Sequence, residues 1–277
     1  MTRSAQPETG FVETNGTQLY YETLGEGHPL VLIHGGYMDR RMWDDQFSVF
    51  AEHYRVIRYD VRGFGSSALP QVPYADWQDL HDLLKALGVE KTYLLGLSLG
   101  GRISIDFTLE HPDMVDALIL TGSPVHGFPI ELLFDEEELK YQEALAVNFE
   151  KATQERNVPG LVDAVMEHPT LVPSPEYPAA RQRVRKNLEE YSFVWVLDPA
   201  PMQTLEPPAY GRLLEIHVPT LIVLGAEDDP VLFKHADKIE HDITGAKRVL
   251  IPRTHHMPNM EKPEEFNNIV LDFLDKL

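Results

Sequence analysis

The sequence predicts an α/β fold, a mostly parallel, doubly wound sheet that carries a helical insertion. Short apolar runs rich in Val, Ile and Leu alternate with segments of helical periodicity along most of the 277 residues. Such runs are too short for helices, and continuously apolar strands are typical of a parallel sheet covered on both faces. Residues 124–207 interrupt the alternation, because they contain helical patterns and no comparable strand.

The strands of the sheet are predicted from turn chemistry and apolar runs. An antiparallel hairpin is expected around Asn15-Gly16, since an Asn-Gly pair between extended stretches favours a two-residue turn. The runs that predict parallel strands are Leu30–Ile33, Arg55–Tyr59, Thr92–Leu95, Ala117–Leu120, Thr220–Leu224 and Arg248–Ile251.

Helices that cover the sheet are predicted from the spacing of apolar residues, at Tyr74–Leu87, Leu99–Leu109 and Lys262–Leu277. In the insertion, helices are expected at Asp135–Asn157, Gly160–His168 and Ala179–Val196. An all-helical insertion between two core strands is typical of a cap. The sequence therefore predicts a core of residues 1–123 and 208–277 and a helical cap, or lid, of residues 124–207.

Composition restricts the function classes. The net charge of −20 argues against nucleic acid as a partner, because phosphate backbones are repelled. No apolar run reaches the ~18 residues that cross a bilayer, which argues against a membrane protein. The absence of cysteine excludes disulfides, thiolate metal sites and a cysteine nucleophile. Met1–Gly10 is polar and lacks the apolar centre of a secretion signal, so a cytoplasmic protein is expected.

The strongest chemical motif is Gly96-Leu97-Ser98-Leu99-Gly100, between a predicted strand and a predicted helix. A serine at such a turn is held in a strained conformation, with its hydroxyl exposed above the sheet. The flanking glycines let the chain pass close to it. Ser98 is therefore the candidate nucleophile, and the N–H of Leu99 at the helix start is a candidate oxyanion donor.

A second motif, His34-Gly35-Gly36-Tyr37, directly follows the strand Leu30–Ile33. A glycine pair here leaves a backbone N–H free to face the nucleophile, so Gly36 is the preferred second oxyanion donor. Tyr37 is the alternative donor and a candidate substrate contact. His34 is interpreted as a buried structural histidine that holds the loop.

After the strand Arg55–Tyr59, Asp60 and Arg62 are expected to form an ion pair that fixes their loop. This pair is given a structural role.

The candidate base and acid lie late in the chain. His255 and His256 follow the last apolar run, where a loop overhangs the sheet edge that carries Ser98. An imidazole suits proton transfer near neutral pH. Asp228, just past the strand Thr220–Leu224, is the preferred acid to orient the histidine, and Asp229 is the alternative.

Together and in this order, these motifs resemble the α/β-hydrolase superfamily, most closely its capped esterase, lactonase and carbon–carbon hydrolase branch. In that branch the catalytic histidine is followed by a short segment and Glu-x-Pro-Glu-x-Phe, here ending at Phe266, which implies His256. The family pattern likewise implies Asp228 as the acid. Asp229, the second aspartate before Pro230, departs from the family pattern and remains an alternative acid. The serine at position 98 also sets the chain apart from dehalogenases and most epoxide hydrolases of this fold, which use an aspartate.

The expected function is hydrolysis of a carboxylic ester by Ser98, His256 and Asp228, without metal or cofactor, on a small-molecule ester or lactone. The protein is expected to act as a monomer or a homodimer. The alternative reactions are lactone hydrolysis and carbon–carbon bond hydrolysis of a vinylogous diketone, for which Arg102 is a candidate contact to an acidic substrate. The alternative of another class is a non-catalytic ligand-binding homologue.

Aromatic residues of the predicted cap are candidates for the lining of the acyl pocket. Packing of the cap helices on one another would explain each of them equally well. They are Tyr141, Phe149, Tyr191, Phe193 and Trp195.

Overall fold

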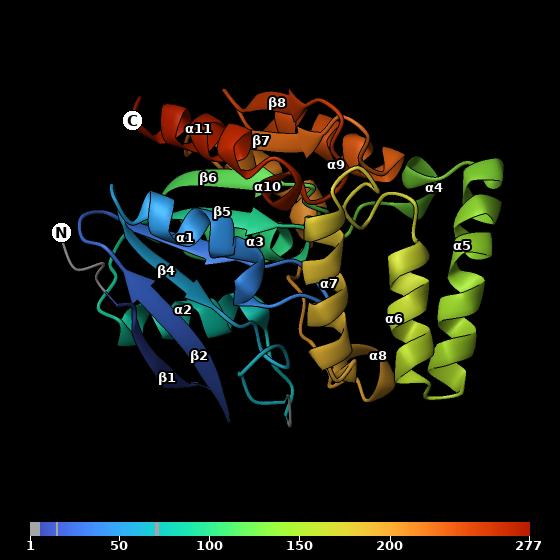
Figure 1. The fold of residues 1–277 in the computed structure, drawn as a ribbon. Coiled ribbons are helices and arrows are strands. Elements are labelled where there is room, and N and C mark those ends of the chain that lie inside the picture. The colour runs from blue at the N-terminus through green and yellow to red at the C-terminus, as the bar shows by residue number, and fades with distance from the viewer. Residues whose placement is uncertain (1–5, 15, 70–71) are drawn as a thin grey trace.

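The computed structural model describes residues 6–14, 16–69 and 72–277 and is shown in Figure 1. Within these ranges, eight strands form one sheet in the order β1-β2-β4-β3-β5-β6-β7-β8. Every neighbouring pair from β4 to β8 is parallel, whereas β2 is antiparallel to both β1 and β4. The predicted mostly parallel sheet is confirmed.

Each predicted apolar run forms a strand. The strands are β1 (Glu8–Thr14), β2 (Thr17–Leu24), β3 (Pro29–Ile33), β4 (Arg55–Tyr59), β5 (Thr92–Leu97), β6 (Val115–Thr121), β7 (Thr220–Gly225) and β8 (Lys247–Ile251). In the hairpin β1–β2, Thr14 is paired with Thr17. Asn15, on which the turn prediction partly rests, lies outside the described residues.

Helices cover both faces of the sheet. They are α1 (Asp44–Phe50), α2 (Asp76–Ala86), α3 (Leu99–Glu110), α9 (Pro230–Asp242), α10 (Pro258–Glu261) and α11 (Pro263–Leu274). Short 3₁₀ helices are η1 (Arg40–Trp43), η2 (Pro112–Met114), η3 (Ala209–Gly211) and η4 (Leu213–Glu215). Helix α1 packs against α11 and α2 against α3, and the two pairs lie on opposite faces (Figure 1). The predicted doubly wound arrangement is confirmed.

The chain between β6 and β7 is mainly helical, as predicted. It contains α4 (Ile130–Leu133), α5 (Glu136–Gln154), α6 (Val158–Glu167), α7 (Pro178–Glu190) and α8 (Val194–Leu197), which we call the helical segment. Figure 1 shows α5, α6 and α7 beside the carboxyl ends of the parallel strands. None of the helices within the described ranges is long and apolar enough to cross a bilayer.

The predicted helix Ala179–Val196 is wrong in its last third. Helix α7 ends at Glu190, and Phe193 has a left-handed backbone with φ of 54° before the short helix α8 begins. The Phe193 ring is fully buried and stacks on Tyr37. Burial of this aromatic ring against the core therefore overrides a helical pattern that would have continued.

The strand order brings distant loops together. Strand β3 lies between β4 and β5, with Ile33 paired to Gly96, so the loops after β3 and β5 leave the sheet side by side. The chain turns to opposite sides of β3 at this point, and ligands of open α/β sheets bind at such switch points. The carboxyl ends of β6, β7 and β8 continue the same edge.

Candidate active site

Ser98 occupies a strained turn between β5 and α3. Its backbone has φ of 53° and ψ of −113°, a conformation that costs energy for a residue with a Cβ atom. The Ser98 N–H donates to the carbonyl of Thr121 on the neighbouring strand, at 2.8 Å. The backbone strain expected at this serine is thus present, and the adjacent sheet holds it in place.

The glycine at position 100 is required by a close approach of two chain segments. A Cβ atom there would lie 2.1 Å from the carbonyl oxygen of Ile33, at the end of β3. Only glycine therefore lets the start of α3 approach the loop that follows β3. This contact brings the two candidate oxyanion segments together.

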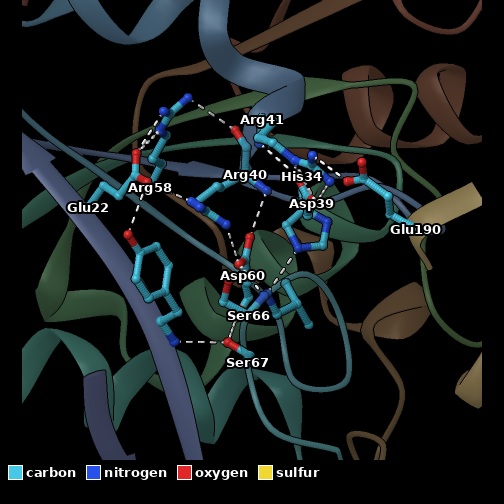
Figure 2. Close-up of polar contacts among 12 residues, drawn as sticks. Glu22, His34, Asp39, Arg40, Arg41, Arg58, Asp60, Ser66, Ser67 and Glu190 are labelled. Carbon is cyan, nitrogen blue, oxygen red and sulfur yellow. Dashed lines mark hydrogen bonds and ion pairs between the residues drawn. The ribbon is translucent and has the colours of Figure 1, made fainter. Parts of the chain in front are cut away.

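The loop after β3 is held by a buried polar network (Figure 2). The Val61 N–H donates to Nε2 of His34 at 2.9 Å, so Nδ1 carries the proton and donates to the Gly35 carbonyl at 2.8 Å. Burial lowers the pKa of His34 and keeps the ring neutral, as this pattern requires. The prediction of a buried histidine that holds the loop is confirmed.

The expected Asp60–Arg62 ion pair is wrong. Asp60 instead accepts from the backbone N–H of Arg40 at 2.9 Å and pairs with its guanidinium at 2.7 Å (Figure 2). Arg62 pairs with Asp79 of α2 at 2.6 Å. Residues two apart in a turn point in different directions, so each of these side chains is paired with a residue distant in sequence.

Three backbone amides close to Ser98 have no acceptor among the described residues. Gly35 donates its N–H to Sδ of Met42, and Met38 donates to the Gly35 carbonyl. The described part of the chain offers no hydrogen-bond acceptor to the N–H groups of Gly36 and Tyr37. Leu99 is the first residue of α3, where N–H groups lack an acceptor within the helix. The amides of Gly36, Tyr37 and Leu99 are therefore available to an anion.

His256 follows β8 and is paired with Asp228, which follows β7. Its Nδ1 lies 3.1 and 3.2 Å from the two carboxylate oxygens, and both residues are buried. Burial lowers the pKa of His256, but the hydrogen bond to Asp228 and the charges of Asp228, Asp229 and Glu261 together outweigh this effect and raise the pKa above its ordinary value. Because a carboxylate accepts, Nδ1 is the donor and Nε2 is left for another partner.

Asp229 and His255, the two alternatives, are engaged elsewhere. Asp229 accepts the Val231 N–H at 3.0 Å and caps the start of α9. The N–H of His255 donates to Glu261 at 2.8 Å, and its Nδ1 lies 3.3 Å from the carbonyl of Val172. Neither residue lines the cavity that contains Ser98 and His256.

A glycine after β6 supports the His256–Asp228 pair. A Cβ atom at Gly122 would lie 2.7 Å from Nδ1 of His256 and 3.1 Å from Oδ2 of Asp228. Any larger residue would push into the hydrogen bond between them. Sequence reasoning missed this role, because the contact joins loops that follow three different strands.

A cavity of about 260 Å³ lies between the sheet edge and the helical segment. The sheet side contributes Ser98, His256 and residues 35–38. The helical side is mainly apolar, with two polar side chains, and consists of Gln142, Leu145, Ala146, Phe149, Ala164, Val165, His168, Leu171, Val184 and Leu188. Ser98 and His256 thus face one space, although the described residues show no hydrogen bond between them.

Most of the aromatic residues expected to line this cavity lie elsewhere. Phe149 lines it, and so does the candidate substrate contact Tyr37. Phe193 is buried in the core, Trp195 donates its indole N–H to the hydroxyl of Tyr74, and Tyr141 is 55% exposed. Tyr191 stacks on Phe64. Tyr191, Phe193 and Trp195 therefore pack against the core rather than between helices of the segment, and Tyr141 is mostly exposed, so neither interpretation is right for these four.

Sequence reasoning also missed the residues that connect the helical segment to the loop of His256. The carbonyl of Thr170 accepts the His256 N–H at 3.1 Å, and its hydroxyl donates to Asp229 at 3.2 Å. The buried carboxylate of Glu261 accepts the N–H groups of Ser174 and His255. These contacts depend on tertiary structure, and apart from Glu261 in the family pattern no sequence signal marked them.

A mostly parallel sheet with a strained serine after β5 and a buried histidine–aspartate pair after β8 and β7 defines a hydrolase of the α/β fold. The chain belongs to the alpha/beta hydrolase family, whose profile matches residues 30–269.

Known proteins of several hydrolytic activities are similar to this chain. One is a 2-hydroxy-6-oxo-6-(2'-aminophenyl)hexa-2,4-dienoic acid hydrolase of Metapseudomonas resinovorans, 28% identical over 96% of this chain and 90% of its own length. The enol-lactonase of Burkholderia xenovorans LB400 is 25% identical, with a TM-score of 0.76 over 96% of this chain and all of the other. Est816, described as an N-acyl homoserine lactone degrading enzyme, is 25% identical, with a TM-score of 0.74 over 95% of this chain and all of the other.

Proposed function

We propose that the protein is a serine hydrolase that cleaves carboxylic esters through an acyl-enzyme on Ser98. His256 is the general base, Asp228 orients it, and the N–H groups of Gly36 and Leu99 hold the oxyanion. The observation that carries the proposal is the His256–Asp228 pair, buried beside the same cavity as the strained serine. Lactones would be cleaved by the same steps.

The proposed reaction has two halves. Oγ of Ser98 attacks the carbonyl carbon while Nε2 of His256 takes the hydroxyl proton, and the oxyanion forms against the free amides. The bond to the leaving alcohol then breaks, and that oxygen takes the proton from His256. Water, deprotonated by His256, cleaves the acyl-enzyme in the same way. The missing Ser98–His256 hydrogen bond is compatible with this scheme, because such bonds often tighten only when substrate is bound.

The charge of the cavity favours a neutral ester or lactone over the dienoate of a carbon–carbon hydrolase. None of the residues that line the cavity is Arg or Lys. Arg102, the cation considered for an acidic substrate, pairs instead with Asp76 and Asp106 and does not line the cavity. A carboxylate in this space would lose its hydration without gaining a cation, which is costly.

The helical segment would act as a cap, so that residues 124–207 form a lid on a core of residues 1–123 and 208–277. The support is that α5, α6 and α7 supply most of the apolar lining opposite Ser98. An apolar lining of this kind suits the hydrocarbon part of an ester.

A fluorophosphonate ester tests the proposal directly, because it traps an activated serine. Wild-type protein should be labelled on Ser98 and should hydrolyse short p-nitrophenyl esters. Ser98→Ala should lose both properties, by at least roughly 10³-fold in turnover. Ser48→Ala, at an exposed position of α1, is the matched control and should behave as wild type.

Two results would contradict the proposal. Full esterase activity in Ser98→Ala would exclude the nucleophile. Turnover of a ring-fission dienoate in preference to every ester would support the carbon–carbon reaction, whereas ligand binding without any turnover would indicate a non-catalytic homologue.

A further inference from the structure

His168 is a polar side chain in the cavity that the proposed chemistry does not use. It caps the carboxyl end of α6 and lines the same space as Ser98 and His256. Apart from Gln142, the side chains that the helical segment places around it are apolar. A single polar group in an apolar lining fixes the orientation of a ligand and provides specificity.

The ring of His168 is held in one tautomer. Its Nδ1 accepts the N–H groups of Thr170 at 3.3 Å and Leu171 at 3.2 Å, so this nitrogen carries no proton. Burial lowers the pKa of His168, which favours the neutral ring. The proton therefore resides on Nε2, at the edge of the ring opposite the loop. No acceptor for this N–H is found among the residues that the structure describes.

The position of His168 indicates which half of a bound ester would lie next to it. Thr170 donates its N–H to His168 and accepts the N–H of His256 through its carbonyl at 3.1 Å, so it bridges the two histidines. In ester cleavage the leaving oxygen takes its proton from the base and must lie against it. His168 thus lies on the side of the leaving group.

We propose that the Nε2–H group of His168 donates a hydrogen bond to an oxygen in the alcohol part of the substrate. The enzyme would accordingly prefer esters, or lactones, whose leaving group carries an ether, hydroxyl or carbonyl acceptor in an otherwise apolar molecule. This inference rests on the proposed ester hydrolysis, since it uses the direction of the leaving group.

A matched pair of esters isolates this contact. Butyl butanoate and 2-methoxyethyl butanoate differ by one methylene replaced with an ether oxygen in the leaving group. Butyl pentanoate and butyl 3-methoxypropanoate place the same change in the acyl group. The ratio of kcat/KM within each pair is measured for every variant, so that the intrinsic reactivity of the esters cancels between variants.

Two substitutions separate the two nitrogens of the ring. In His168→Asn the side-chain oxygen can still accept the Thr170 N–H, but the donor into the cavity is lost. In His168→Gln an N–H donor can reach the place of Nε2, but the loop acceptor is lost. His217→Asn, at an exposed histidine, is the matched control.

His168→Asn is expected to lower the ratio for the leaving-group pair by about 2- to 10-fold, the effect of one neutral hydrogen bond. Its melting temperature should stay near that of the wild type. His168→Gln should retain the ratio and melt at a lower temperature. A variant His168→Ala, which removes the donor without adding a charge to the apolar lining, replaces His168→Asn if the latter does not fold.

An unchanged leaving-group ratio in His168→Asn, with all esters still hydrolysed, would overturn the inference and leave the proposed function intact. A fall in the acyl pair instead would also overturn it, because His168 would then lie on the acyl side. If wild-type protein hydrolyses none of the four esters and Ser98 is not labelled, the proposed function itself fails, and this inference fails with it.

Discussion

Helices α3 and α5 lie on opposite sides of the cavity and are anchored very differently. In α3, which begins directly after Ser98, every residue except Arg102 and Glu110 is buried. In α5, which supplies Phe149 and three other lining residues, Ala152 is the one buried residue. The first helix is fixed by the core on all sides, whereas the second is held along a narrow stripe.

This difference separates the proposed chemistry from the selection of substrate. Groups on the sheet edge are positioned by backbone geometry and buried hydrogen bonds, so a change there should affect the reaction itself. Groups on α5 contact the cavity from a helix with a single buried residue, so a change there should alter which substrate is accepted. The following predictions test that separation, in order of decreasing effect.

The largest effect is expected for Asp228→Asn. The amide cannot hold His256 in the required tautomer, so kcat should fall by about 10⁴-fold in a p-nitrophenyl ester assay. Asp229→Asn is the matched control, because its amide oxygen can still accept the Val231 N–H. Its expected loss is less than roughly 10-fold. If the two variants changed places, Asp229 would be the acid.

Gly122→Ala should reduce kcat by about 10²-fold, because the new methyl group displaces His256 from Asp228. Steady-state kinetics together with a thermal melt would separate this effect from global unfolding. Gly211→Ala is the control, since nothing lies within 4 Å of a Cβ atom at that position. Unimpaired turnover in Gly122→Ala would show that the geometry behind the histidine tolerates movement.

The pH profile should report the environment of His256. The base must be neutral, and its pKa is raised above the ordinary value of 6.5 because Asp228 and the nearby carboxylates of Asp229 and Glu261 together outweigh the opposing effect of burial. The value of kcat/KM should therefore increase with pH and level off above the pKa of His256, which lies above 6.5. Below that pKa, kcat/KM should decrease about 10-fold for each pH unit.

Residual activity of Asp228→Asn gives the matching measurement for this profile. Burial of His256 remains in that variant while the carboxylate charge is gone, so the pH dependence of kcat/KM should move to lower pH. If the pH dependence of kcat/KM is the same in this variant as in the wild type, a group other than His256 is titrating.

On the helical side, Phe149→Ala should change selectivity more than rate. Removal of the ring enlarges the cavity, so longer acyl chains should be accepted while short esters change by less than roughly 10-fold. Tyr141→Ala, on the same helix but 55% exposed and outside this cavity, should leave the chain-length profile unchanged. A loss of all activity in Phe149→Ala would contradict this prediction, because a change on α5 would then affect the reaction itself.

The smallest effect is expected where α7 meets the loop after β3. Arg41 pairs with Glu190 of α7 at 2.6 Å and with Asp39 of the loop (Figure 2). The pair with Glu190 is partly exposed, so Glu190→Gln should lower the free energy of unfolding by only about 0.2–1 kcal/mol in a urea titration, and less at high salt. Glu189→Gln, which alters a pair within α7, is the control. A larger, salt-independent loss would mean that α7 is anchored as firmly as α3.

Much of the core could be predicted from the sequence, because its signals are local. A strand buried on both faces must be apolar along its length, and the turn at Ser98 needs glycines on either side. The strands and the strained serine could therefore be predicted from neighbouring residues. The same logic failed for Asp60 and Arg62, since the partners of a buried charge are chosen by tertiary contact and lie elsewhere in the chain.

The sequence by itself determined the parallel sheet, the strained serine and the order of the candidate chemical groups along the chain. Only the tertiary structure decided which carboxylate meets His256, that α7 ends before Phe193, and that His168 rather than Tyr141 or Trp195 faces the cavity. The physical reason is the distance along the sequence between the residues that determine each feature. Backbone strain and strand burial are set by residues a few positions apart, whereas a cavity is lined by whichever side chains the packing of distant helices turns inward.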